Sequence, residues 1–120
     1  MNAKSTTHAH KASDTLCPIA RLNDAFRQMP VDGRLAITAG VIALGNGALS
    51  DILLTVASFD AFTPGNDPYG EHNFGAFEWH GKRIFWKIDC YDRTMRFGSP
   101  DPADPSVTTR VLTVMLAEEY

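Results

Sequence analysis

FGAFEWHGKRIFWKIDCYD, residues 74–92, is the stretch that decides the fold. Its apolar and polar residues alternate on both sides of a central glycine, which is the pattern of two half-buried strands joined by a tight turn. If Gly81 and Lys82 are the two loop residues, the turn is of type II′, because glycine readily takes a positive φ at the first position. The sequence therefore predicts a β-hairpin over residues 75–91.

This turn fixes a register in which His80 pairs with Arg83 and Trp79 with Ile84. The register separates an apolar face from a polar one, and a slip of one residue would mix them. The apolar face holds Phe77, Trp79, Ile84, Trp86, Ile88 and Cys90. The polar face holds Ala76, Glu78, His80, Arg83, Phe85, Lys87, Asp89 and Tyr91.

The segments around the hairpin show mainly helical periodicity. Apolar residues recur at spacings of three or four over residues 13–29 and again over 48–61, and each run predicts an amphipathic helix. Residues 34–41 predict a strand, although the stretch after Ile37 also suits a helix. A last helix is expected from Pro105, after an N-cap at Asp104. Its buried stripe would be Val107, Val111, Leu112, Met115 and Leu116, and that of the first helix Leu16, Ile19, Leu22, Phe26 and Met29.

These elements predict an α+β fold: a small antiparallel sheet of about three strands on two or three helices, in two layers. The length of 120 residues suits one domain. Residues 1–12 are polar and are expected to form a disordered tail, and residues 13–120 a single domain. His8 and His10 in that tail are expected to be solvated.

Composition excludes several classes of protein. With 14 acidic and 11 basic residues the net charge is −3, so direct nucleic-acid binding by a basic surface is not expected. The longest weakly polar run, residues 35–45, is too short to cross a membrane. Cys17 and Cys90 form neither a zinc motif nor a disulfide framework, which suits a cytoplasmic location. On the apolar face, Cys90 is expected to be an inert core thiol.

No sequence motif indicates a reaction. GxSxG, P-loop, GxGxxG and HExxH patterns are all missing, so no cofactor and no metal site are assigned, and a non-enzyme is favoured over an enzyme.

The loop over residues 60–75 holds the densest cluster of chemically capable side chains. Asp and Glu with His suit a hard-metal site or an acid–base pair, particularly if Asp89 and Asp92 converge on them. The same residues equally suit turns and surface ion pairs with Lys87 and Arg93. The cluster consists of Asn66, Asp67, Glu71, His72 and Asn73.

A second candidate surface is the polar face of the hairpin, where aromatic residues lie among charges. From Asp60 to His80 there are also four acidic residues and no Lys or Arg, a bias that could meet a basic partner. The candidate binding residues from both regions are Asp67, Tyr69, Glu71, His72, Glu78, Phe85, Lys87, Asp89 and Tyr91.

Several motifs resemble those of a bacterial family of small uncharacterised proteins known only as a domain of unknown function. They include NDPYGEH at residues 66–72, IFWKIDCYDR at 84–93 and FGSPDP at 97–102. The resemblance spans residues 13–120. It implies a cytoplasmic protein associated with plasmids and other mobile elements, and it assigns no reaction, cofactor or catalytic residue.

Three hypotheses of function follow. The first is a non-enzymatic module that binds a protein partner, as an accessory or counter-defence factor of the anti-restriction or anti-CRISPR type. The alternative is a small metal-assisted hydrolase or nuclease that uses Asp67, Glu71, His72 and Asp89. The third is a homodimer with the polar face of the hairpin between the two copies.

Overall fold

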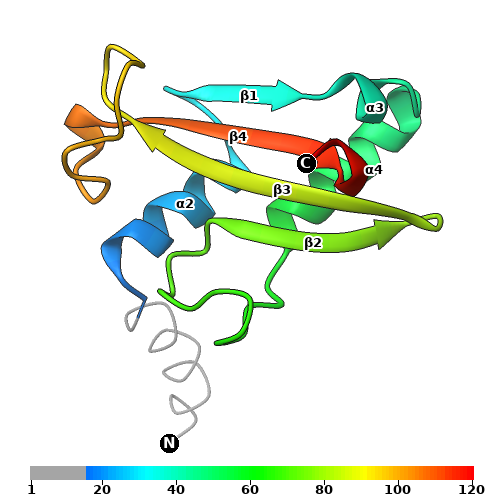
Figure 1. Cartoon of the computed structure of the whole chain (residues 1–120), viewed down its shortest axis with the longest axis horizontal. Coiled ribbons are helices and arrows are strands. Elements are labelled where there is room, and N and C mark those ends of the chain that lie inside the picture. Colours follow the sequence, from blue (N-terminus) through cyan, green and yellow to red (C-terminus); the bar gives the residue numbers. More distant parts are fainter. Residues whose placement is uncertain (1–15) are drawn as a thin grey trace, which may run out of the picture.

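The computed structural model of the chain describes residues 16–120. Two helices, α2 (Pro18–Gln28) and α4 (Asn46–Ser58), lie on one face of a four-stranded sheet (Figure 1). On the other face, among the residues that the structure describes, only the short C-terminal turn η2 (Ala117–Glu119) lies over the strands (Figure 1). The expected α+β architecture in two layers is therefore confirmed, with four strands where about three were predicted.

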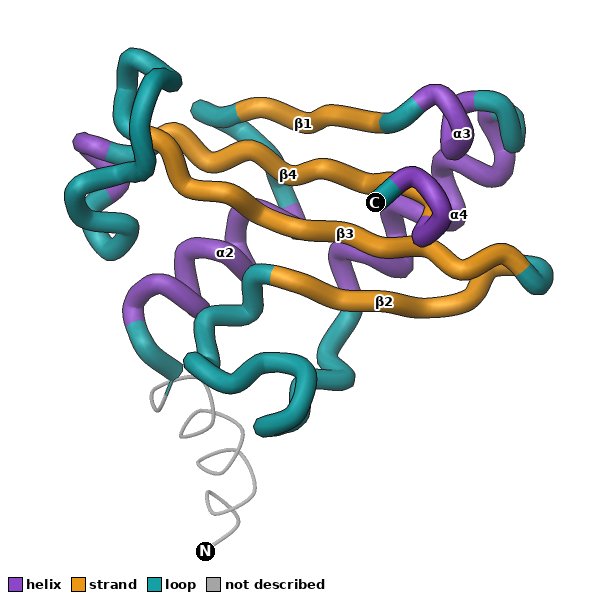
Figure 2. The backbone as a smooth tube through the Cα atoms, in the orientation of Figure 1, coloured by secondary structure: helices purple, strands orange, loops and turns teal. Residues whose placement is uncertain are grey.

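The strands are β1 (Arg34–Ile37), β2 (Phe74–Trp79), β3 (Lys82–Tyr91) and β4 (Thr109–Leu116), in the spatial order β1-β4-β3-β2 (Figure 2). β2 and β4 each run antiparallel to β3, whereas β1 runs parallel to β4. The sheet is thus mixed, and the prediction of an antiparallel sheet holds for only three of the four strands.

The predicted C-terminal helix is wrong, because that segment is the inner strand β4. Asp104 does cap as expected, since its side chain accepts a hydrogen bond from the Ser106 N–H at 2.9 Å, but it opens only the 3-10 turn η1 (Pro105–Val107). The chain then becomes extended through a segment rich in β-branched residues, which favour strands. Leu112 and Val114 face the helices, and a spacing of two residues is that of side chains on one face of a strand. The apolar residues of this segment also recur at the spacing of a helix, so the sequence pattern alone fits both structures.

The hairpin forms, but its turn lies one residue earlier than predicted. His80 and Gly81 both have positive φ, at 49° and 79°, as a type I′ turn requires. Trp79 therefore pairs with Lys82 rather than Ile84. Each residue of β2 thus pairs with a residue of β3 two positions away from the predicted partner. Because side chains alternate between the faces with a period of two, every side chain keeps its predicted face. Residues on the predicted apolar face are indeed buried or packed against the core.

The remaining boundaries differ by a few residues. The first strand ends at Ile37 and a single helical turn, α3 (Ala39–Ile42), follows. The predicted helix over 48–61 is α4. The predicted helix over 13–29 is α2, with residues 13–15 and the expected tail over 1–12 lying outside the described part of the chain.

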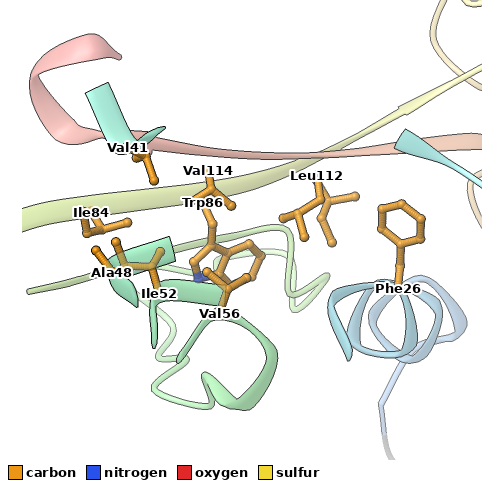
Figure 3. Close-up of a cluster of buried hydrophobic side chains, with 10 residues drawn as sticks. Phe26, Val41, Ala48, Ile52, Val56, Ile84, Trp86, Leu112 and Val114 are labelled. Carbon is orange, nitrogen blue, oxygen red and sulfur yellow. The ribbon is translucent and has the colours of Figure 1, made fainter. Parts of the chain in front are cut away.

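The core lies between the sheet and the two helices, and Trp86 is its largest fully buried side chain. Ile52 and Val56 point from α4 toward the indole, beside Leu112 and Val114 of β4 (Figure 3). On β2, a Cβ at Gly75 would lie 2.3 Å from Trp86 Nε1. Position 75 must therefore lack a side chain for the indole to fit.

The buried face of α2 is not the apolar stripe expected from the sequence. Of the five stripe residues only Phe26 is buried, with 6% of its surface exposed, and Met29 is 66% exposed. The helix instead buries two polar side chains, Asn23 and Arg27, which are 1% and 5% exposed. Buried polar groups of this kind need partners, and those partners determine where the loop before β2 lies.

The C-terminal turn is fastened to α3 by Glu119. Its carboxylate accepts hydrogen bonds from the Thr38 hydroxyl at 2.6 Å, the Leu116 N–H at 2.8 Å and the Gly40 N–H at 2.9 Å. These bonds, chiefly that from the Thr38 hydroxyl, lower the pKa of Glu119 below its ordinary value of 4.5.

We expect Glu119→Gln to lower the stability of the folded protein at neutral pH and to leave its stability in strong acid unchanged. A carboxyl whose pKa is lowered by folding contributes stability above its unfolded pKa, and loses it as pH falls through the folded pKa. Thermal unfolding of both proteins from pH 7 to pH 2 measures this. A difference in melting temperature that stays constant across the series would contradict the prediction.

Candidate functional site

The uncovered face of the sheet collects five of the nine candidate binding residues. The pairing register places them on the side away from α2 and α4, on β2 and β3. They are Glu78, Phe85, Lys87, Asp89 and Tyr91. We call this surface, with the aromatic residues described next, the open sheet face.

Three aromatic rings lie together on the open sheet face. Phe85 contacts Phe74 on the neighbouring strand, with ring centroids 5.2 Å apart, and Tyr120 from the C-terminal end at 5.6 Å. Tyr120 is 74% exposed. Sequence reasoning missed Phe74 and Tyr120, because the C-terminal segment was expected to be a helix and gave no reason to bring residue 120 over the hairpin.

Next to the rings, Lys87 and Asp89 form an ion pair on the same strand, with Nζ and Oδ2 2.9 Å apart. The Lys87 ammonium donates a hydrogen bond to Asp89, and this bond is the main cause that raises the pKa of Lys87 above its ordinary value. Both side chains are more than a third exposed, so the pair contributes little to stability. Breaking this ion pair would therefore cost little free energy, so both charged groups could pair with groups of a binding partner.

The loop before β2 is built around Asp67, whose side chain is buried. Its carboxylate accepts the Glu71 N–H at 3.1 Å and the His72 N–H at 3.2 Å. Asn66 and Thr63 bond each other's backbone N–H groups with their side chains, at 2.8 and 3.2 Å. These are the turn-making bonds that Asn, Asp and Thr commonly form, so Asn66 and Asp67 shape the loop.

His72 joins this loop to α2. Its Nδ1 lies 2.9 Å from Asp24 Oδ1, and its Nε2 lies 3.8 Å from Asp67 Oδ2. The imidazole also stacks on Phe62, with centroids 3.8 Å apart and planes 6° from parallel. The ring is thus held between two carboxylates and an aromatic face. Asp24 was missed from the sequence, because it precedes His72 by 48 residues and lies in a helix.

Two further links come from the buried polar residues of α2. Asn23 donates to the Glu71 carbonyl at 2.9 Å and accepts from Arg110 Nε at 2.7 Å. Arg27 donates to Asp24 at 2.7 Å and to the Val56 carbonyl. The Asn23 bond to Glu71 and the His72 contact fix the loop to α2, while Arg27 joins α2 to α4.

The hydrolase hypothesis names four residues, of which the structure brings Asp67 and His72 together. Asp67 and His72 are neighbours, but Glu71 joins the network through its backbone, and Asp89 pairs with Lys87 on the open sheet face. Among residues 16–120, no group of three or more His, Cys, Asp or Glu side chains is placed to hold a metal ion.

The other predicted residues also lie apart from this network. Tyr69 is 85% exposed at the tip of the loop. Asp92 closes its own turn by accepting the Thr94 and Arg96 N–H groups, both at 3.1 Å. Cys90 is half-buried on β3, and burial raises the pKa of its thiol, which weakens it as a nucleophile.

Within the described residues, no helix is both long enough and apolar enough to cross a membrane. A family model described as "Protein of unknown function (DUF3768)" matches residues 37–119. Comparisons with curated proteins and with solved structures gave no significant match.

Proposed function

We propose that this chain, which belongs to the DUF3768 family of proteins of unknown function, is a non-enzymatic module that acts by binding another protein. The family description names no activity, so the proposal rests on the side chains of this chain.

The observation that carries the proposal is the open sheet face. Within residues 16–120, one side of the four-stranded sheet carries neither α2 nor α4, and it presents a group of aromatic rings beside an exposed ion pair. Protein interfaces are enriched in aromatic residues at their centre and have a polar rim. Phe85 and Tyr120 would form that centre, with Lys87, Asp89 and Tyr91 around them.

The loop residues do not call for a second function. Asp67 holds the loop's own backbone by accepting the His72 N–H, and His72 holds the loop to α2 through Asp24.

The resemblance noted from the sequence supports a finer form of this proposal. On that basis the protein acts in the cytoplasm as an accessory or counter-defence factor of a mobile element, and its partner is a component of a restriction or CRISPR system.

The test is a pull-down from a lysate of the cells that encode the protein, followed by titration of the purified partner. We expect Tyr91→Ala and Lys87→Glu each to weaken binding at least tenfold, because both alter the open sheet face. Arg96→Glu is the matched control for the charge change, since Arg96 is exposed in the turn after β3. Thermal unfolding of each variant verifies folding.

Recovery of no specific partner at native salt would overturn the proposal. So would a partner that the Tyr91 and Lys87 variants bind as well as the Arg96 variant does.

A further inference from the structure

The helical layer carries a second surface, on the opposite side of the sheet from the open sheet face. Two neighbouring hollows lie between α2 and α4. They share three lining residues, Arg27, Gln28 and Ala57. We call the two together the helix groove.

One end of the helix groove is apolar. This hollow, of about 430 Å³, is lined by Pro30, Leu35, Leu53 and Leu54 among others. Leu54 is 69% exposed and Leu35 is 41% exposed. Large apolar side chains exposed beside a hollow are typical of a binding surface, because water contact leaves their apolar area unfavourably hydrated.

The other end is polar. It is a hollow of about 390 Å³, with Asp24, Ser58, Asp60, Phe62 and His72 in its lining. Arg27 is the basic residue in this lining. Its side chain is only 3% exposed, and it already pairs with Asp24. Asp60 is exposed, so the accessible charge at this end is negative.

The charge of α4 and of the loop after it points the same way. Between Leu35 and Gly81 the sequence contains no Lys or Arg. This stretch includes α4 and the loop beside it. Its acidic residues are Asp51, Asp60, Asp67, Glu71 and Glu78.

Two of these acidic residues flank the groove. Asp51 follows Ser50, which lines the apolar hollow, and Asp60 lines the polar one. The helical rise separates residues 51 and 58 by roughly 10 Å, so one carboxylate lies near the apolar hollow and the other at the polar hollow.

We infer that the helix groove binds a basic amphipathic segment of a protein partner. A large apolar side chain of the segment would enter the hollow beside Leu54, and Lys or Arg residues would reach Asp51 and Asp60. Helix-in-groove recognition of this kind uses an apolar anchor, and complementary charge sets its specificity. The inference does not depend on the open sheet face.

The experiment measures fluorescence anisotropy of a labelled amphipathic helix made only of leucine and lysine, at about 0.15 M salt. Its counterpart, made of leucine and glutamate, tests the charge. We expect saturable binding of the lysine peptide by the full chain and none of the glutamate peptide. Leu54→Ala should weaken binding about tenfold, and Asp60→Asn and Asp51→Asn severalfold each.

Matched controls separate the groove from the general surface. Ile42 is 59% exposed on α3, and Ile42→Ala should leave binding unchanged, as should Glu78→Gln on β2. The Lys87→Glu variant, altered on the open sheet face, should bind the peptide like the wild type. The peptide result therefore does not depend on whether the open sheet face is an interface. Equal binding of the two peptides would overturn the inference. Equal effects of Leu54→Ala and Ile42→Ala would do the same.

Discussion

Trp86→Ala is expected to lower the free energy of unfolding by about 3–5 kcal/mol, the range for deleting a buried large aromatic side chain. The indole is fully buried and forms the middle of the core between the sheet and α4 (Figure 3). Its removal leaves a cavity that the surrounding β-sheet cannot close. For a domain of this size the loss corresponds to a melting temperature lower by on the order of 10–20 °C.

Trp86→Phe separates packing from hydrogen bonding. The Trp86 Nε1 atom is buried and has no hydrogen-bond partner within residues 16–120, so phenylalanine removes volume without breaking a hydrogen bond. We expect it to cost clearly less than alanine does. Urea unfolding of the three proteins measures both differences. A loss below about 1 kcal/mol for Trp86→Ala would show that the core does not depend on the indole.

The position of Trp86 illustrates what the sequence could predict. Alternation over residues 74–92 depends only on the two-residue period of a strand, so the faces of the hairpin followed correctly even though the turn was misplaced. The register depends on which residues take positive φ. Histidine at position 80 has no local feature that signals a φ of 49°, whereas Gly81 does.

The C-terminal strand shows the opposite case. Val111, Leu112 and Met115 fit a helical stripe and a buried strand equally well. The choice is made by β3 and β1, which hydrogen-bond to this segment on both sides. Such long-range pairing overrides local periodicity.

The candidate site divides in the same way. The sequence drew attention to Asp67 and His72, because turn-rich loops with acidic and imidazole side chains are conspicuous. Their partner Asp24 could not be predicted. The buried hydrogen bond that joins α2 to β4 links Asn23 to Arg110, which are 87 residues apart in the sequence. Polar residues along one side of a helix normally indicate a solvent-exposed face, so the pattern gave no sign of this burial.

This buried polar network leads to the second large effect, Arg27→Ala. The guanidinium donates to Asp24 and to the Val56 carbonyl, and its Cζ lies 4.7 Å from the centroid of the Trp86 ring. Removing one member of a buried pair leaves the other uncompensated, at a typical cost of about 3–5 kcal/mol. Because Asp24 is 23% exposed, water recovers part of this, and we expect about 3 kcal/mol.

Arg27→Lys and Arg21→Ala make the cause of that loss measurable by urea unfolding. Lysine keeps the charge but lacks the planar fork that bonds two acceptors while stacking on Trp86, so we expect it to recover only part of the stability. Arg21 lies on the same helix and is exposed, so its replacement should cost less than about 1 kcal/mol. If Arg27→Ala were no more costly than Arg21→Ala, the buried guanidinium would not hold α2 and α4 together. Full recovery by lysine would instead show that charge alone matters and that the fork and the stacking contribute nothing.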